Sequence, residues 1–477
     1  MEDKEKQIRN KKRVSQFGEV LTSKREVLDM LNLVKYETTR LESRFLEPAC
    51  GDGNFLSEVL NLKLNSLEKD FVKNKYEFEK ISIIIFGSIY GIDILKDNVI
   101  IARNRLYDQY LEIYNKNFKN DDNPKLFKCI KYILDKNIIH ADALSFIHSP
   151  TPEEIFDMKF DVIIGNPPYQ MSDGGGGGGS AKPIYNKFIN TAKRLNPRYL
   201  TMIIPSRWYS GGKGLDEFRE EMLNDKRISK IVDFPDSSDC FPGVEIKGGV
   251  CYFLWERDYS GECEITNINK SKKNIFKRPL LEKDLNFFIR YNRSISIIRK
   301  VLKFKDENFS SLVSARKPFG ISDFKGKSKK NKNDIKIFYI RGFGYIDEKK
   351  ILTGKENIKK HKVFISKAYG AGEGFPHQII NKPFYGETNS VCTETYLHIG
   401  PFSSKLECEN VISYIKTKFF RFLVLMIKNT QNTTRSVYRL VPIQNFEKKW
   451  NDKLLYKKYD LDQNEIKFIE DMIRPMD

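Results

Sequence analysis

The sequence predicts an α/β protein in which a largely parallel sheet, covered by helices on both faces, is followed by a mixed α+β domain. The chain has 477 residues, too many for one ordinary hydrophobic core, so at least two domains are expected. In its first half, apolar runs such as 199–204 and 228–234 alternate with segments of helical periodicity, as in a doubly wound sheet. After about residue 309, shorter apolar stretches are separated by Gly, Pro, Asn and Lys, which indicates a strand-rich second domain.

The composition favours a polyanionic partner. The chain carries 82 Lys and Arg against 63 Asp and Glu, a formal net charge of +19, and such a surface attracts polyanions. Its 7 cysteines are scattered, without a C-x-x-C pair or a cluster with histidine, so we expect reduced, mostly buried thiols and no metal site. We expect a cytoplasmic protein, because the sequence has neither a signal peptide pattern nor a run of about 18 apolar residues.

The most informative stretch is Asp161-Val-Ile-Ile-Gly-Asn-Pro-Pro-Tyr169. Residues 162–165 are typical of a buried strand, and the two prolines end it because proline donates no ladder hydrogen bond and fixes its own φ. The Asn166 side-chain oxygen and the Pro167 carbonyl can then accept both hydrogens of an exocyclic amino group, while the Tyr169 ring stacks on the attached planar ring. These bonds would draw the nitrogen lone pair out of conjugation and direct it at an electrophile. The stretch therefore predicts a site for a planar amine.

A glycine-containing turn, Glu47-Pro-Ala-Cys-Gly-Asp-Gly53, follows the first predicted strand. Its two glycines allow the backbone to approach a ligand closely at the mouth of that strand. The spacing is not G-x-G-x-x-G, and the acids Glu47 and Asp52 favour a ligand with positive charge. Thr22 precedes a helix predicted to begin near residue 24, where its hydroxyl could bind a carboxylate. A simple helix cap explains that segment equally well.

Two further acids end predicted strands. The apolar runs 81–85 and 88–93 are consistent with parallel strands, and Asp93 ends the second, where an acid can bind ribose hydroxyls. Capping of the next helix is the alternative role, but Asp97 is the better cap. A third strand is predicted to end at Asp142, where a carboxylate can accept from an adenine amino group. His140 lacks partners at ligand spacing, so we expect a structural or surface role.

Several further segments allow two interpretations. Six consecutive glycines, 174–179, predict either a mobile flap beside the cleft or a tolerated low-complexity loop. Phe241, expected to be exposed before a proline, is the candidate for a second aromatic wall. Residues 235–247 superficially match a metal-dependent nuclease pattern, but 248–255 already predict the next strand of the same sheet, so we treat that match as coincidental.

The second half is predicted to bind a polyanion. A basic run at 269–278 suggests a linker, which gives a first domain at 1–265, a basic and helical linker at 266–308, a second domain at 309–446 and a helical tail at 447–477 that packs back on the body. Amides, hydroxyls and aromatic rings next to Lys and Arg are the groups that contact phosphates and base edges. The candidate nucleic-acid contacts are Arg316, Lys317, Lys367, Tyr369, Lys428, Gln431 and Arg435.

Taken in order, Thr22, the turn at 47–53, Asp93, Asp142 and Asn166-Pro-Pro-Tyr169 resemble the gamma-type adenine-N6 DNA methyltransferases (TaqI-like and Eco57I-like) of restriction-modification and related systems. The resemblance covers roughly residues 16–255, and the later region looks like that family's target-recognition domain. It implies a Rossmann-like S-adenosylmethionine-dependent methyltransferase sheet, with S-adenosyl-L-methionine as cofactor. It also implies double-stranded DNA as partner, with the target adenine flipped out of the duplex.

The resemblance also implies roles for individual residues. Asn166, Pro167 and Pro168 would hold the target amine, with Tyr169 and Phe241 on either side of the base. Cofactor contacts would come from Thr22, Glu47, Ala49, Cys50, Gly51, Gly53, Asp93, Ile94, Asp142, Ala143 and Asn166. Thr22-Ser23 stands where Thr-Pro is commoner, and His140-Ala141-Asp142 replaces a more usual Gly-Asp.

Three alternatives remain at the level of sequence. Enzymes that methylate protein glutamine amides use the same Asn-Pro-Pro-Tyr chemistry, and RNA adenine or cytosine-N4 methylation would use it too. A DNA-binding subunit with a dead site is disfavoured, because every catalytic position is filled. We expect no endonuclease activity, because no convincing cleavage site precedes the first strand, so any restriction partner would be a separate chain.

Overall fold

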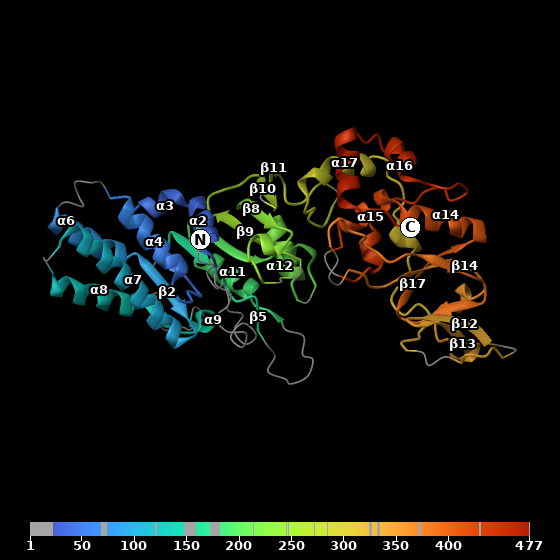
Figure 1. The fold of residues 1–477 in the computed structure, drawn as a ribbon, viewed down its shortest axis with the longest axis horizontal. Helices are drawn as coiled ribbons and strands as arrows, with labels where there is room; N and C mark the ends of the chain where they lie inside the picture. The colour runs from blue at the N-terminus through green and yellow to red at the C-terminus, as the bar shows by residue number, and fades with distance from the viewer. Residues whose placement is uncertain are drawn as a thin grey trace. The chain divides into compact units, whose positions relative to one another are not determined.

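A computed structural model describes residues 22–67, 74–119, 122–146, 159–171, 182–212, 214–244, 246, 248–270, 272–283, 285–323, 327–331, 334–370, 374–428 and 431–476. The chain divides into two compact units, unit 1 at Met1–Phe288 and unit 2 at Ile289–Asp477 (Figure 1).

Unit 1 is organised around a large mixed sheet. Its described strands are β1 (Phe45–Glu47), β2 (Ile89–Asp93), β3 (Ile138–His140), β4 (Val162–Gly165), β7 (Tyr199–Pro205), β8 (Ile228–Phe234), β9 (Val250–Glu256), β10 (Cys263–Asn269) and β11 (Lys272–Arg278). They lie in the order β11-β10-β8-β9-β7-β4-β1-β2-β3. Strands β7, β4, β1, β2 and β3 are parallel to their neighbours within this group. β9 runs antiparallel to both β7 and β8, β10 is parallel to β8, and β11 is antiparallel to β10.

Helices cover both faces of this sheet. One set comprises α2 (Lys24–Leu33), α3 (Lys35–Thr39), α4 (Asn54–Asn65), α6 (Lys75–Phe86), α7 (Lys96–Asn117) and α8 (Pro124–Asn137), and the other α9 (Ala143–Phe146), α11 (Tyr185–Arg194) and α12 (Asp216–Asn224). Val162 and Ile164 of β4 pack into the cluster formed with the first set, whereas Ile163 packs into the cluster formed with the second. Because successive side chains of a strand point to opposite faces, the two sets flank the sheet. The predicted Rossmann-like α/β class is therefore confirmed.

One predicted strand is a helix. Residues 81–85 lie in α6, where Phe78, Ile81 and Ile85 are buried while Ile83 and Ile84 are 39% and 43% exposed. That alternation has the period of a helix lying on a core. A short apolar run is compatible with a buried strand and with a half-buried helix, so its composition alone does not distinguish them.

The expected linker at 266–308 begins inside the sheet. Residues 263–269 and 272–278 form β10 and β11, and the two units meet in sequence after Phe288. The basic composition of 269–278 indicates an edge strand here, because Lys side chains are common on unpaired sheet edges. The third strand also differs, since β3 ends at His140, two residues before Asp142.

Unit 2 has the predicted mixed α+β character. Among its described residues, β13 (Gly342–Asp347), β12 (Asp334–Tyr339) and β16 (Ser390–Cys392) form one sheet, and β15 (Phe384–Gly386), β14 (His361–Ser366) and β17 (Tyr396–Phe402) form another. Its helices are α13 (Ile295–Leu302), α14 (Lys405–Lys416), α15 (Lys418–Leu425), α16 (Asp452–Lys458) and α17 (Gln463–Met472). α17 begins with the predicted capping box between Asp462 and Glu465. It packs on α15, where the rings of Phe422 and Phe468 are 5.7 Å apart.

The cysteines are free thiols, as predicted. Six are buried, and Cys129 on α8 is partly exposed. None of the helices in the described ranges is both long enough and apolar enough to cross a membrane.

Candidate functional site

The corner at Asn166–Tyr169 lies in the middle of the sheet. β4 pairs with β1 on one side and β7 on the other, and the corner follows its carboxyl end. The backbone of Gly165 approaches the Glu47 side chain so closely that a Cβ at Gly165 would lie 3.2 Å from the Glu47 Cγ. Beyond the corner, the Tyr169 carbonyl accepts a hydrogen bond from the Ile184 N–H at 3.2 Å, next to a short pairing of β5 (Gln170–Met171) with β6 (Lys182–Pro183). The predicted strand and proline stop are confirmed.

The Asn166 side chain is oriented by a residue far away in sequence. Its Nδ2 donates to the Thr22 Oγ1 at 3.1 Å, and Thr22 is only 4% exposed. The Thr22 carbonyl in turn accepts from the Asn54 Nδ2 at 3.2 Å, so Thr22 connects the corner to the first residue of α4. Burial raises the pKa of the Tyr169 hydroxyl well above its ordinary value. Thr22 thus lies beside the corner, as the site prediction requires.

The glycine turn joins the ends of β1 and β2. The Cys50 N–H donates to the Ile92 carbonyl at 2.9 Å, and the Gly51 N–H donates to the Asp93 Oδ2 at 2.8 Å. Gly51 and Gly53 have φ of 51° and 84°, a left-handed conformation that glycine adopts without a steric penalty. A Cβ at Gly53 would also lie 3.1 Å from the Ala102 Cβ on α7. The turn therefore requires glycine for backbone geometry and for close packing.

Three carboxylates lie around this turn. Glu47, Asp52 and Asp93 are 3%, 3% and 8% exposed. Burial, together with the charges of Asp52 and Asp93, raises the pKa of Glu47 well above its ordinary value. Arg105 forms an ion pair with Asp52 at 3.2 Å. Within the described part of the chain, however, the Glu47 Oε2 is buried without a hydrogen-bond partner. The cluster is suited to a ligand that carries positive charge.

Asp93 is held by backbone groups at the start of α7. Its Oδ1 accepts from the Leu95 N–H at 2.8 Å and from the Asn98 side chain at 3.3 Å. The helix begins at Lys96, so Asp97 lies inside its first turn and is not the cap that the sequence suggested. The neighbouring Ile94 is 52% exposed, an apolar surface beside the Asp93 carboxylate.

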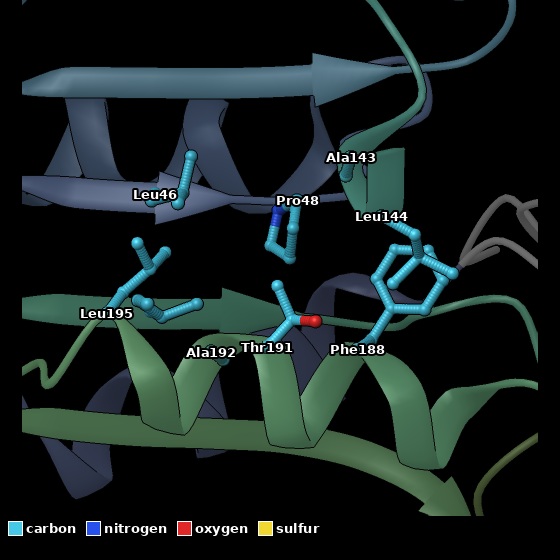
Figure 2. A pocket seen from close by; sticks show the side chains of 9 residues that line it. Leu46, Pro48, Ala143, Leu144, Phe188, Thr191, Ala192 and Leu195 are labelled. Atoms are coloured by element: carbon cyan, nitrogen blue, oxygen red, sulfur yellow. The ribbon is translucent and has the colours of Figure 1, made fainter. Parts of the chain in front are cut away.

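Asp142 lies at the surface and is bonded locally. Its Oδ1 accepts from the Leu144 N–H at 3.0 Å and its Oδ2 from the Ser145 hydroxyl at 2.7 Å. It borders an open polar groove along α11. The adjacent Ala143 is buried, in a tight apolar crevice between the ends of β1 and β4 and helix α11. Figure 2 shows the Leu144 and Phe188 side chains next to each other at one end of this crevice.

The expected exposure of Phe241 is wrong. Phe241 is fully buried, in the same core cluster as Cys240 and Tyr252. The 3-10 turn η2 (Ser237–Asp239) directs it inward, because the N–H of Phe241 bonds back to the Ser237 carbonyl at 2.7 Å. A position as an exposed aromatic wall is therefore excluded in this conformation. The glycine run 174–179, Glu245 and Lys247 lie outside the described residues.

The predicted nucleic-acid segments of unit 2 come together. Lys317 and Lys367 both form ion pairs with Glu394, at 3.5 Å and 3.0 Å. The Tyr369 N–H donates to the Gln431 carbonyl at 2.7 Å. These contacts join three segments that are distant in sequence into one surface. Further members are Arg316, which is exposed, Lys428, which donates to the Tyr369 carbonyl, and Arg435, which donates to the Ser310 carbonyl.

Two residues of this surface were missed by sequence reasoning. Arg474 lies near the C-terminus, and its Nη2 donates to the Tyr369 hydroxyl at 2.8 Å. Glu394 is the acid that the two lysines share. No local pattern in the sequence could have indicated either contact, because both depend on how distant segments pack.

The sheet gives unit 1 a Rossmann-like α/β fold, with the glycine turn after β1 and the asparagine-proline corner after β4. Residues 87–241 match the family model described as Eco57I restriction-modification methylase. Over these residues the chain is similar to that family, in agreement with the resemblance of its motifs.

Two curated relatives match parts of the chain. An uncharacterized adenine-specific methylase of Mycoplasma pneumoniae is 46% identical over 153 residues, covering 28% of this chain and 36% of that protein. The Type II restriction enzyme and methyltransferase RM.Eco57I of Escherichia coli is 26% identical over 235 residues, covering 41% of this chain and 23% of that protein. The matched regions thus span well under half of either relative.

Solved structures share the fold. The Type IIL restriction-modification enzyme MmeI, in complex with DNA, has a TM-score of 0.52 at 13% identity, covering 90% of this chain and 68% of that chain. A nuclease-deletion mutant of the Type ISP enzyme LlaGI, with a DNA substrate mimic, has a TM-score of 0.52 at 12% identity, covering 86% and 45%. Sequence identity this low supports similarity of fold alone.

Proposed function

We propose that the protein transfers a methyl group from S-adenosyl-L-methionine to the N6 amino group of an adenine flipped out of double-stranded DNA. The observation that carries this proposal is the adjacency of two features: a corner that can accept hydrogen bonds from a planar amine and a buried acidic turn suited to a cation. The Asn166 amide, bonded to Thr22, belongs to the first, and Glu47 belongs to the second. The close approach of Gly165 to Glu47 connects them.

The residues present fit the cofactor. The buried Glu47 oxygen that lacks a partner among the described residues suits the cofactor's amino group or sulfonium, since a buried carboxylate without a cation is costly. Thr22, Cys50, Gly51 and Gly53 would hold the methionine end, and Asp93 with Ile94 the ribose and the adjoining base. Ala49, Ala143 and Asp142 would complete the adenine side. When bound, the cofactor supplies an electrophilic methyl group.

The corner supplies orientation rather than acid-base chemistry. Because the Asn166 Nδ2 donates to Thr22, the amide has a defined orientation, with its oxygen as the acceptor for the target amine. The Pro167 carbonyl accepts the second hydrogen, and the rigid Pro167-Pro168 pair limits movement of both acceptors. Tyr169 would stack on the base. Positioning a nucleophile beside its electrophile can account for much of the rate enhancement.

The partner would be duplex DNA, held by unit 2. Its converging basic and aromatic side chains, among them Lys317, Lys367 and Tyr369, suit phosphates and base edges. A separate restriction endonuclease would be a further partner. Under this proposal unit 1 carries the chemistry and unit 2 the target reading.

Asn166→Ala tests the proposal, with Asn190→Ala on α11 as a control for loss of another partly exposed amide. We expect Asn166→Ala to abolish transfer of labelled methyl groups to duplex DNA and to leave cofactor affinity within a few-fold of wild type. Nucleoside analysis of wild-type product should yield N6-methyldeoxyadenosine. Modified cytosine, RNA or protein glutamine would identify another substrate, and undiminished turnover by Asn166→Ala would refute the role of the corner.

A further inference from the structure

The hairpin formed by β10 and β11 carries an unusual concentration of exposed positive charge. We call residues 269–277 the basic hairpin. β11 is the terminal strand of the sheet, and every residue of it from Lys272 to Lys277 is exposed. Ile275 and Phe276, neighbours on the strand that point to opposite faces, are 58% and 45% exposed. The core of unit 1 therefore makes little use of the side chains of this strand.

The turn of the hairpin lies at the same edge of the sheet as the corner. β8 and β7 are both antiparallel to β9, so they run in the same direction, and β7 is parallel to β4. β10 is parallel to β8. β10 and β4 therefore point the same way, and the turn after Asn269 is at the carboxyl edge, as is Asn166. Lys270, Lys272 and Lys273 follow immediately.

The turn is fixed in position by the segment before Phe241. The Lys270 N–H donates to the Asp239 Oδ2 at 2.9 Å. The Asp239 carbonyl accepts from the Arg25 side chain of α2 at 2.6 Å. The backbone of the turn is thus bonded to a segment that is bonded to α2, whose preceding residues include Thr22. A turn held in this way presents its lysines in a defined place on the carboxyl edge of the sheet, where β8, β9 and β7 separate β10 from β4.

Within the described ranges, the ammonium groups of the hairpin lysines are not held in ion pairs, although Asp239 bonds to the Lys270 backbone and Glu264 lies opposite Lys277 in the register of β10 and β11. Among the described residues, Lys270, Lys272, Lys273 and Lys277 form no ion pair, although Glu264 in β10 pairs with Lys230 of β8 at 3.5 Å. A lysine-rich edge can simply prevent edge-to-edge aggregation. Four lysines around exposed apolar side chains, at the edge that holds the site, also match the pattern of a surface that binds a phosphate backbone.

We propose that the basic hairpin binds the phosphate backbone of duplex DNA beside the target base, as a contact of unit 1 separate from the surface in unit 2. This inference rests on the proposed function for its substrate. A second copy of the chain is a poorer occupant of the edge, because pairing two such strands would bring like charges together. Phosphate contacts position the duplex without reading its sequence, so the hairpin would contribute affinity and register.

The test compares two triple variants of the full chain. Lys270→Gln, Lys272→Gln and Lys273→Gln remove three charges from the hairpin. The matched control removes three from α8, at Lys125, Lys128 and Lys136, which are exposed and lie on a helix packed near β3 at the opposite end of the sheet. Affinity for a fluorescent duplex is measured without cofactor over a range of salt concentrations. Cofactor binding and sedimentation are measured for each variant to verify folding and oligomeric state.

Each lost phosphate contact should reduce the slope of log affinity against log salt by about 0.9. We therefore expect a reduction of about 2.7 for the hairpin variant and little change for the α8 variant, with unchanged cofactor binding in both. The proposal would be overturned by equal slopes in the two variants or by an unaltered slope in the hairpin variant. It would also be overturned if DNA binding by the wild type did not depend on salt. So would an altered oligomeric state with an unaltered slope, which would assign the edge to contacts between copies. The binding assay requires no methyl transfer. Failure of the proposed reaction and failure of the hairpin proposal can therefore be told apart.

Discussion

Replacing Thr22 by valine is the sharpest test of how the corner is organised. The substitution keeps the volume of the side chain and removes the hydroxyl that accepts from the Asn166 Nδ2 at 3.1 Å. Thr22 is 4% exposed, so water has little access to replace this acceptor. Thr22→Val should therefore loosen the orientation of the Asn166 amide without opening a cavity.

The expected effect follows from the cost of a lost buried hydrogen bond. Leaving a buried donor without its acceptor costs about 1–3 kcal/mol. If that cost appears in the positioning of the target amine, kcat should fall about 5-fold to about 150-fold, since about 1.4 kcal/mol corresponds to a factor of ten in rate. Thr22→Ser keeps the hydroxyl and should retain most of the wild-type rate.

Single-turnover methylation of a duplex substrate, combined with equilibrium binding of the cofactor, separates the two possible roles of Thr22. A positioning role lowers the rate at saturating cofactor and leaves the cofactor Kd nearly unchanged. A role limited to the cofactor raises that Kd and spares the saturated rate. A wild-type rate for Thr22→Val at saturation would refute the reasoning, and so would an equal loss in Thr22→Ser.

Two further substitutions test the charges of each unit. Burial and the charges of Asp52 and Asp93 raise the pKa of Glu47, so its contribution to stability is full below its ordinary pKa and is lost as the pH rises through the raised value. Glu47→Gln should then increase Tm more at pH 8 than at pH 4.5, and it should weaken cofactor binding. Equal Tm shifts at the two pH values in thermal denaturation would contradict this expectation. Glu394→Gln removes the acid shared by Lys317 and Lys367. It should tighten DNA binding and steepen the salt slope by up to about 0.9, and weaker binding in a titration would show that Glu394 instead positions the lysines.

The corner and the turn could be predicted because their chemistry is local. Two adjacent prolines end a strand in the middle of a sheet because they donate no ladder hydrogen bonds, which placed Asn166 at the carboxyl end of β4. The glycines at 51 and 53 likewise permit the left-handed backbone of the turn. The contact between Thr22 and Asn166 spans 144 residues, and its location followed from the order of the motifs rather than from any local pattern.

The errors arose where distant packing decides the outcome. Phe241 is turned into the core by the backbone bonds of η2, which the adjacent proline did not indicate. Residues 272–278 of the basic run form a strand because β10 pairs with β8 and presents its other edge to them. Residues 81–85 become part of a helix because the core lies along one side of them. In each case short-range composition was compatible with more than one structure.

The distribution of the thiols also determines how the protein can be labelled. Burial, reinforced by the charges of Glu47 and Asp93, raises the pKa of Cys50 well above its ordinary value, so alkylating reagents that require a thiolate should leave the glycine turn intact. Cys129 is the partly exposed cysteine, on α8 at the far end of the sheet from the basic hairpin. A maleimide dye attached there would report on the native protein without touching the corner, the turn or the hairpin.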